Sequence, residues 1–156
     1  MKTILSLLAT ATLLLGANIA RAADPIVGTW TLNVSKSKFA SPAPTSEMRT
    51  YSESADGSIS LAAKTVGADG KQTSETSSFR LDGKEYPYES DTIDADSVSE
   101  RRISSHVTAW KLKKNGKVVE TGRRTVSRDG RTLTMIQRGT NARGEKFTNI
   151  AVYDKE

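Results

Sequence analysis

Residues 24–34 read DPIVGTWTLNV, and this stretch decides the fold class. Every second residue in it is apolar or glycine: Ile26, Gly28, Trp30, Leu32 and Val34. A period of two is typical of a half-buried β-strand, because successive side chains of a strand point to opposite faces. We therefore predict a strand here that buries Trp30.

Tight turns follow along the rest of the sequence. Asp-Gly or Asn-Gly dipeptides occur at residues 56–57, 69–70, 82–83, 115–116 and 129–130. These dipeptides accept positive φ angles and favour β-hairpins. Alternating segments lie between or after them: Ile59, Leu61 and Ala63; Thr108, Trp110 and Leu112; Leu133, Met135 and Gln137; Ile150 and Val152. The pattern predicts nine or ten antiparallel strands joined to their nearest neighbours, whereas the inward face of residues 117–127 stays open.

A meander of this length leaves two exposed edges unless it closes, and closure removes them. The fold class we predict is all-β, a single antiparallel up-and-down barrel. Helix is expected at most for one turn over residues 35–39, because Pro42 and Pro44 prevent its continuation.

The first 22 residues resemble a secretory signal peptide: Lys2, an apolar run over residues 4–15, and a small-x-small site at residues 20–22. We expect cleavage there, a barrel domain over residues 23–156, and a periplasmic or secreted location. The apolar run is too short to span a membrane comfortably, and no later segment comes close. The sequence has no cysteine, which excludes disulfides, thiol catalysis and zinc-thiolate sites.

The expected domain has few apolar residues and an uneven charge. Leu, Ile, Val and Phe make up 23 of residues 23–156. Residues 23–100 carry a net charge of −6 and residues 101–156 a net charge of +9. We expect a folded barrel with a partly polar interior. The charge asymmetry favours mutual neutralisation of acidic and basic strands over contact with an anionic surface, although both interpretations stay open.

A Gly-x-Trp on the first strand followed by a β-meander resembles the lipocalin and fatty-acid-binding-protein superfamily. Together, GTWTLNVSKSKF, a proline-rich step, KVVETGRRTVSRDGRTLT and NIAVYDK resemble small exported bacterial lipocalin-like proteins, over nearly the whole of residues 23–156. The resemblance implies that Gly28 and Trp30 plug one end of the barrel, with a late arginine against the tryptophan. The candidates are Arg123, Arg124 and Arg138. The fatty-acid clamp Arg-x-Tyr is absent, since Ala151 precedes Tyr153 where arginine would stand.

Trp110, Met135 and Gln137 are the candidate ligand-binding residues. If they point inward, they give an apolar wall and one polar anchor, as in small-molecule pockets. The simpler interpretation is that they only fill the core. A buried amide such as that of Gln137 still needs a partner, which could be a ligand, a water or a neighbouring residue.

Other candidates are weaker. His106 is the sole histidine and could serve catalysis or haem, but a solvated histidine explains it better. The acidic residues 89, 91, 94, 96 and 100 lack the spacing of an EF-hand, so a solvated loop is favoured over calcium. The basic residues at 101–102, 111, 113–114, 117 and 123–124 lack the interleaved aromatics of nucleic-acid binders, and anionic envelope lipid suits them better.

We therefore expect no enzyme, no cofactor, no metal and no nucleic-acid partner. The leading hypothesis is an exported binding protein that holds a small apolar or amphiphilic ligand in its barrel. The alternative is a structural or interaction protein of the cell envelope, with a filled barrel and a basic outer face.

Overall fold

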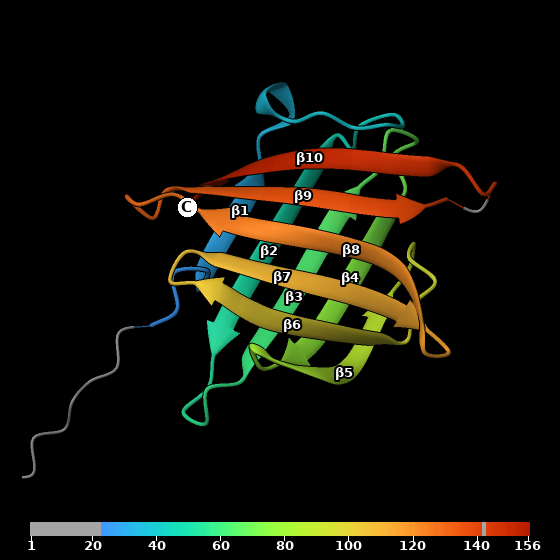
Figure 1. Cartoon of the computed structure of the whole chain (residues 1–156). Helices are drawn as coiled ribbons and strands as arrows, with labels where there is room; N and C mark the ends of the chain where they lie inside the picture. The colour runs from blue at the N-terminus through green and yellow to red at the C-terminus, as the bar shows by residue number, and fades with distance from the viewer. Residues whose placement is uncertain (1–22, 142) are drawn as a thin grey trace, which may run out of the picture.

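Each strand of the chain pairs with the strand that follows it, and the last pairs with the first. The computed structural model describes residues 23–141 and 143–156, which form a closed antiparallel barrel of ten strands (Figure 1). The predicted all-β up-and-down barrel is therefore confirmed. The predicted signal peptide, residues 1–22, lies outside the described residues. The strands are β1 (Gly28–Leu32), β2 (Ser46–Glu53), β3 (Ile59–Val66), β4 (Gln72–Phe79), β5 (Asp82–Ser90), β6 (Ser97–Ser104), β7 (Val107–Lys114), β8 (Lys117–Val126), β9 (Thr132–Thr140) and β10 (Lys146–Lys155).

The predicted turn residues lie at or beside the hairpin connections. Glycines 57, 70, 83, 116 and 130 all have φ between 71° and 80°, a region that favours glycine. Within the described residues, Asn115 is the one non-glycine residue with positive φ, at 50°. Only the Asn-Gly pair therefore uses positive φ at both positions. The Asp-Gly pairs use it at glycine alone, and the aspartates at 56, 69, 82 and 129 accept a backbone hydrogen bond from the residue two positions on.

Strands β1 and β10 close the barrel, and the connection after β1 lies against β10. The expected helical turn is a short 3₁₀ helix, η1 (Val34–Lys36). After it, Lys38 forms a backbone bridge to Ile150. Ile150 and Val152 alternate along the sequence as expected for a strand, but they are only half-buried, and Ala151 and Tyr153 are the buried residues of that stretch. They pair across the ladder with Met135 and Leu133, whereas the backbones of Ile150 and Val152 form hydrogen bonds with the segment after β1.

The two ends of the barrel differ. The closed end carries residues 24–27 and the connections β2–β3, β4–β5, β6–β7 and β8–β9. The open end carries the connections β1–β2, β3–β4, β5–β6, β7–β8 and β9–β10. Figure 1 shows strands β6 to β10 across the front of the barrel, crossing β1 to β4 behind them. Strands from both layers therefore contribute side chains to the interior.

The predicted polar interior is confirmed. Apolar side chains such as Leu61, Phe79 and Leu133 are buried, and so are Arg49, Glu100, Glu120 and Arg124. On β8 the even-numbered residues 120, 124 and 126 are buried, which settles the inward face of that strand. Few apolar side chains suffice because charged groups occupy the remaining interior.

Charged side chains also join the acidic and basic parts of the chain. Ion pairs connect Arg124 with Glu100, Lys113 with Glu85, Lys114 with Asp94, and Arg102 with Asp24. These contacts support the interpretation that the two charge-biased parts neutralise each other. Among residues 23–141 and 143–156, the structure contains no helix long and apolar enough to cross a membrane.

Candidate functional site in the barrel interior

Trp30 is buried at the end of the barrel that carries residues 24–27, where the resemblance implies a plug, and the plug role stays a prediction. Its ring is fully buried and its indole Nε1 donates a hydrogen bond of 2.7 Å to the carbonyl oxygen of Ile26. The cation over the ring is Lys155, whose Nζ lies 4.9 Å from the ring centroid. The predicted arginine partner is thus wrong, since β10 supplies a lysine directly across from Trp30 in the ladder.

The alternatives named for that partner lie elsewhere: Arg123 and Arg138 are exposed, and Arg124 lies in the interior over Trp110. Gly28 has a specific role beside the plug. Its φ is +133°, and a Cβ atom there would lie 2.6 Å from Cε of Lys155. The glycine of Gly-x-Trp therefore makes room for the lysine that covers the tryptophan.

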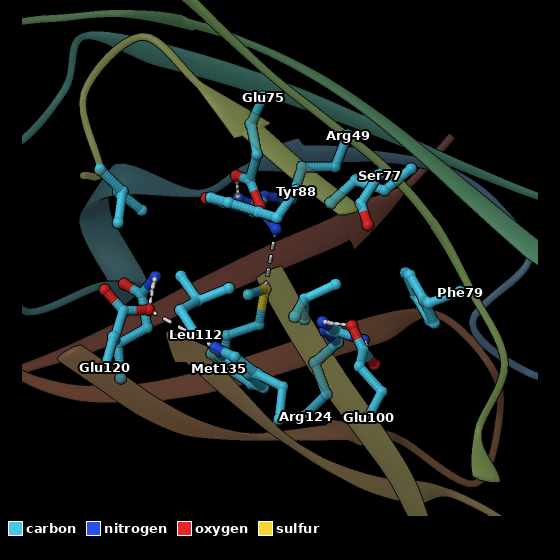
Figure 2. Close-up of a pocket in the computed structure, with 15 residues that line it drawn as sticks. Arg49, Glu75, Ser77, Phe79, Tyr88, Glu100, Leu112, Glu120, Arg124 and Met135 are labelled. Atoms are coloured by element: carbon cyan, nitrogen blue, oxygen red, sulfur yellow. Dashed lines mark hydrogen bonds and ion pairs between the residues drawn. The ribbon is translucent and has the colours of Figure 1, made fainter. Parts of the chain in front are cut away.

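Arg124 and Glu100 form a buried ion pair deep in the barrel. Both guanidinium nitrogens Nη1 and Nη2 donate to the carboxylate, at 2.6 and 2.7 Å (Figure 2). The guanidinium also lies 4.8 Å from the ring centroid of Trp110 and 5.3 Å from that of Tyr51. Burial by itself lowers the pKa of Arg124, but the Glu100 carboxylate outweighs burial and raises it. This group stays charged, held by a bidentate pair and aromatic faces.

A second ion-paired group centres on Arg49 of β2. Its Nε donates to Glu47, and its Nη2 donates to Glu75 of β4 at 2.5 Å. The hydroxyl of Tyr153 donates to Glu47 at 3.1 Å, and the Arg49 guanidinium lies 5.8 Å from the tyrosine ring centroid. Burial lowers the pKa of Arg49, but the two carboxylates outweigh burial and raise it. Two acids therefore share one interior cation.

Glu120 of β8 is an interior acid of a different kind. Its side chain accepts hydrogen bonds of 3.4 Å from Trp110 Nε1 and 3.4 Å from Gln137 Nε2. No lysine or arginine of the described residues forms an ion pair with it. Burial raises the pKa of Glu120 to about 7, and these hydrogen bonds offset burial only in part. In Figure 2 it lies on one side of the cluster and Phe79 on the other, with Met135 between them.

Two spaces adjoin Glu120. The first is a cavity of about 20 Å³ inside the barrel, which it lines together with the two arginines, Glu75, Glu100 and Tyr88. A space of that size accepts one water-sized group. The second is an open hollow of about 490 Å³ at the open end, within the range of small-molecule pockets. The hollow is lined by Thr92, Ile93, Asp94, Lys114, Val119, Glu120, Thr140, Asn141 and Phe147.

Glu120 and Ile93 line both spaces, so they mark the boundary between them. Ile93 comes from the β5–β6 connection and is half-buried against the core. Phe147 packs beside Gly139 on the neighbouring strand, where a Cβ atom would lie 2.8 Å from its Cζ. Ile93, Val119 and Phe147 give the hollow its apolar surface, Asp94 and Lys114 line it as an ion pair, and Glu120 lies where it meets the interior cavity.

All three residues predicted to bind ligand line the interior cavity: Trp110, Met135 and Gln137. Trp110 and Met135 are buried, and Gln137 is half-buried with Glu120 as its amide partner. The structure therefore brings together the three residues that the sequence pattern grouped. Their contact with a ligand stays a prediction, because the cavity that they share is small.

Sequence reasoning missed the charged interior residues Arg49, Glu75, Glu100 and Glu120. A signal was available for β8, where Glu120, Gly122, Arg124 and Val126 alternate with outward residues. Gly122 is the residue that makes room for Trp110. A Cβ atom there would lie 2.0 Å from the indole ring, and the two residues face each other across the ladder.

The remaining candidates are dispersed. His106 lies in the β6–β7 turn beside a cavity of about 10 Å³ at the closed end, and its Nδ1 has no hydrogen-bond partner in the described part of the chain. Among the acidic candidates, Glu100 is inside the barrel, Asp94 pairs with Lys114, and Asp91 accepts from Ser74. Within residues 23–141 and 143–156, no three His, Asp or Glu side chains are grouped to hold a metal ion.

The comparisons with known proteins are limited to fold. No protein-family model matches this sequence, and no curated protein sequence does. The structure of EF1p2_mFAP2b bound to DFHBI is similar, with a TM-score of 0.51 and 9% identity over 87% of this chain and 98% of that one. A redesigned β-barrel, mFAP1, bound to DFHBI, gives a TM-score of 0.45 and 12% identity over 87% of this chain and 100% of that chain.

The fold and the site together define a class: a ten-stranded up-and-down barrel with an ion-paired interior and a hollow at its open end. This architecture is consistent with the lipocalin-like fold that the sequence resembles. Membership of that family stays a prediction.

Proposed function

We propose that this chain is a non-enzymatic binding protein that holds a small amphiphilic molecule at the open end of its barrel. The observation that carries the proposal is the hollow of about 490 Å³ that ends on the buried Glu120 carboxylate. Apolar walls and a few polar groups at fixed positions are typical of small-molecule sites.

The filled interior supports this position for the ligand. A cavity of about 20 Å³ has no room for a whole organic molecule, so the body of the ligand lies in the hollow. Trp110, Met135 and Gln137 then form the floor rather than the walls of the site. The fold neighbour EF1p2_mFAP2b is bound to the small ligand DFHBI, so a barrel of this kind is compatible with ligand binding.

The compartment is part of the proposal. The signal-peptide pattern of residues 1–22 favours export to the periplasm or the medium. N-terminal sequencing of protein recovered from those fractions tests it, and an uncleaved protein in the cytoplasm contradicts it.

Substitutions at two adjacent valines test whether a ligand binds in the hollow. Val119 lines it, whereas the neighbouring Val118 is 50% exposed and takes no part in it. Val119→Lys places a charge and a long side chain among the apolar walls, so we expect binding of the neutral dye Nile red to weaken about tenfold or more. Val118→Lys is the matched control and leaves the dye affinity unchanged. Equal affinity in all three proteins contradicts binding in the hollow.

One observation favours a second candidate function, binding to an anionic envelope surface. Arg101, Lys111 and Arg123 are exposed on neighbouring strands β6 to β8, and none of them has an ion-pair partner in the part of the chain that the structure describes. Sedimentation with vesicles of anionic lipid tests this candidate. Binding that falls steeply with added salt supports it, and equal binding to neutral vesicles contradicts it.

A further inference from the structure

Glu120 is the interior carboxylate that the chain leaves without a cation in the described residues. Glu100 is paired with Arg124, and both Glu47 and Glu75 are paired with Arg49. We propose that the polar end of the ligand is a protonated amine that binds the Glu120 carboxylate. This inference rests on the proposed function and names the chemical class of the ligand.

The charge of the interior favours a cation. The four acids Glu47, Glu75, Glu100 and Glu120 face two arginines there. A buried charge is stable when it is paired, and an ammonium group beside Glu120 supplies the missing positive charge. An anionic ligand would instead have to displace a carboxylate from Arg49 or Arg124, each of which already holds its partners at hydrogen-bond distance.

The dimensions of the two spaces match the two ends of an alkylamine. The cavity of about 20 Å³ accepts a group of the size of water, which is also the size of an ammonium group. The hollow of about 490 Å³ accepts the apolar body. Because Glu120 and Ile93 line both spaces, a ligand that enters from the open end brings its head past Ile93 to the carboxylate.

A second buried group points to the same head group. Tyr88 is 4% exposed, it lines the interior cavity, and its hydroxyl has no hydrogen-bond partner in the described structure. A phenol oxygen accepts hydrogen bonds, and an ammonium group has three N–H donors and no acceptor. Glu120 and Tyr88 therefore offer two acceptors to one donor-rich group. A hydrogen bond from that group to the tyrosine oxygen offsets the free-energy cost of burying the hydroxyl without a partner.

Three ligands of equal length test the charge preference in the unmodified protein: octylamine, octanol and octanoate. Isothermal titration calorimetry is carried out at pH 8. At this pH the amine is protonated, and Glu120, whose pKa is about 7, is mostly ionised. The groups that face this carboxylate are Trp110, Gln137, Glu75 and Arg49. We expect octylamine to bind about tenfold or more tightly than octanol, and octanoate to bind most weakly.

Variants locate the effect. Glu120→Gln keeps the shape and removes the charge, so we expect the preference for octylamine over octanol to disappear. Glu145→Gln is the control, because Glu145 is an exposed carboxylate paired with Arg143 outside the hollow, and it leaves the preference intact. Tyr88→Phe should reduce the affinity for octylamine and leave that for octanol unchanged.

The outcomes separate the two proposals. Equal affinity for the three ligands, weakened by Val119→Lys, contradicts the amine and leaves the binding function standing. A preference for octylamine that survives Glu120→Gln contradicts the assignment to this carboxylate. If none of the three ligands and no Nile red binds to the unmodified protein, both the amine and the proposed function are wrong. Loss of folding in a variant does not affect the comparison in the unmodified protein, which decides the ligand class by itself.

Discussion

The free energy of unfolding depends on pH in part through Glu120, and a single substitution of this residue removes that part. Burial raises the pKa of Glu120 from the ordinary value of 4.5 to about 7, so the folded state binds a proton more tightly than the unfolded state. The group therefore lowers the free energy of unfolding as pH rises from 4.5 to 7. Below pH 4.5 Glu120 does not change the free energy of unfolding, and above pH 7 it lowers that free energy by its full amount of about 3 kcal/mol.

Urea unfolding of the unmodified protein and of Glu120→Gln at pH 4.5 and pH 8 measures this contribution. Because other carboxylates titrate in both proteins, the difference between the proteins is the informative quantity. We expect the unmodified protein to lose about 3 kcal/mol relative to Glu120→Gln across this range. A difference that is constant with pH means that Glu120 titrates normally. Glu145→Gln, at an exposed site, serves as the control.

At the scale of single elements, β7 and β8 are fitted to each other at one pair of residues. Trp110 faces Gly122 across the ladder, and a Cβ atom on Gly122 would lie 2.0 Å from the indole. Trp110 has little room to move, because Arg124 lies over its ring and it is 4% exposed. We expect Gly122→Ala to lower the free energy of unfolding by about 1–3 kcal/mol and to change the tryptophan near-ultraviolet circular dichroism.

Thr125→Ala is the matched control, since Thr125 lies on the same strand and is exposed. It should leave both the stability and the near-ultraviolet spectrum close to those of the unmodified protein. If Gly122→Ala is as stable as Thr125→Ala, the two strands have enough freedom to separate at this pair.

The elements differ in how far their sequence determines them. Alternation placed the inward faces of β1, β3, β7 and β9 correctly, because each strand carries most of its large apolar residues on one face. Alternation did not decide the inward face of β10, where apolar residues occur on both faces. It left β8 open, because its inward face carries Glu120 and Arg124. Contacts with other strands decide which face of such a strand points inward, and the residue pattern within one strand does not show those contacts.

At the scale of the whole molecule, turns and closure were predictable, but the charged interior was predictable only in outline. A low apolar content indicated polar groups inside the barrel. The partners could not be assigned, because Arg124 of β8 meets Glu100 of β6, two strands away, and Arg49 of β2 meets Glu75 of β4. Such contacts reach over one intervening strand, so their spacing in the sequence depends on the register of two successive ladders and not on the periodicity within one strand.

The Arg124–Glu100 pair tests what these charges contribute to the whole barrel. Both side chains are almost fully buried, at 4% and 1% exposure, so removal of one partner leaves an uncompensated charge in the core. We expect Glu100→Met alone to lower the free energy of unfolding by about 3–5 kcal/mol. The double variant Glu100→Met with Arg124→Met should recover most of that loss, because an apolar pair of similar volume needs no compensation. Urea unfolding of the two single variants and the double variant measures the coupling. The opposite outcome is a double variant whose loss of unfolding free energy equals the sum of the losses in the two single variants. In that case the pair is required for the packing of Trp110, Tyr51 and Phe79 around the guanidinium. The ions then stabilise the barrel through those rings and not only through each other.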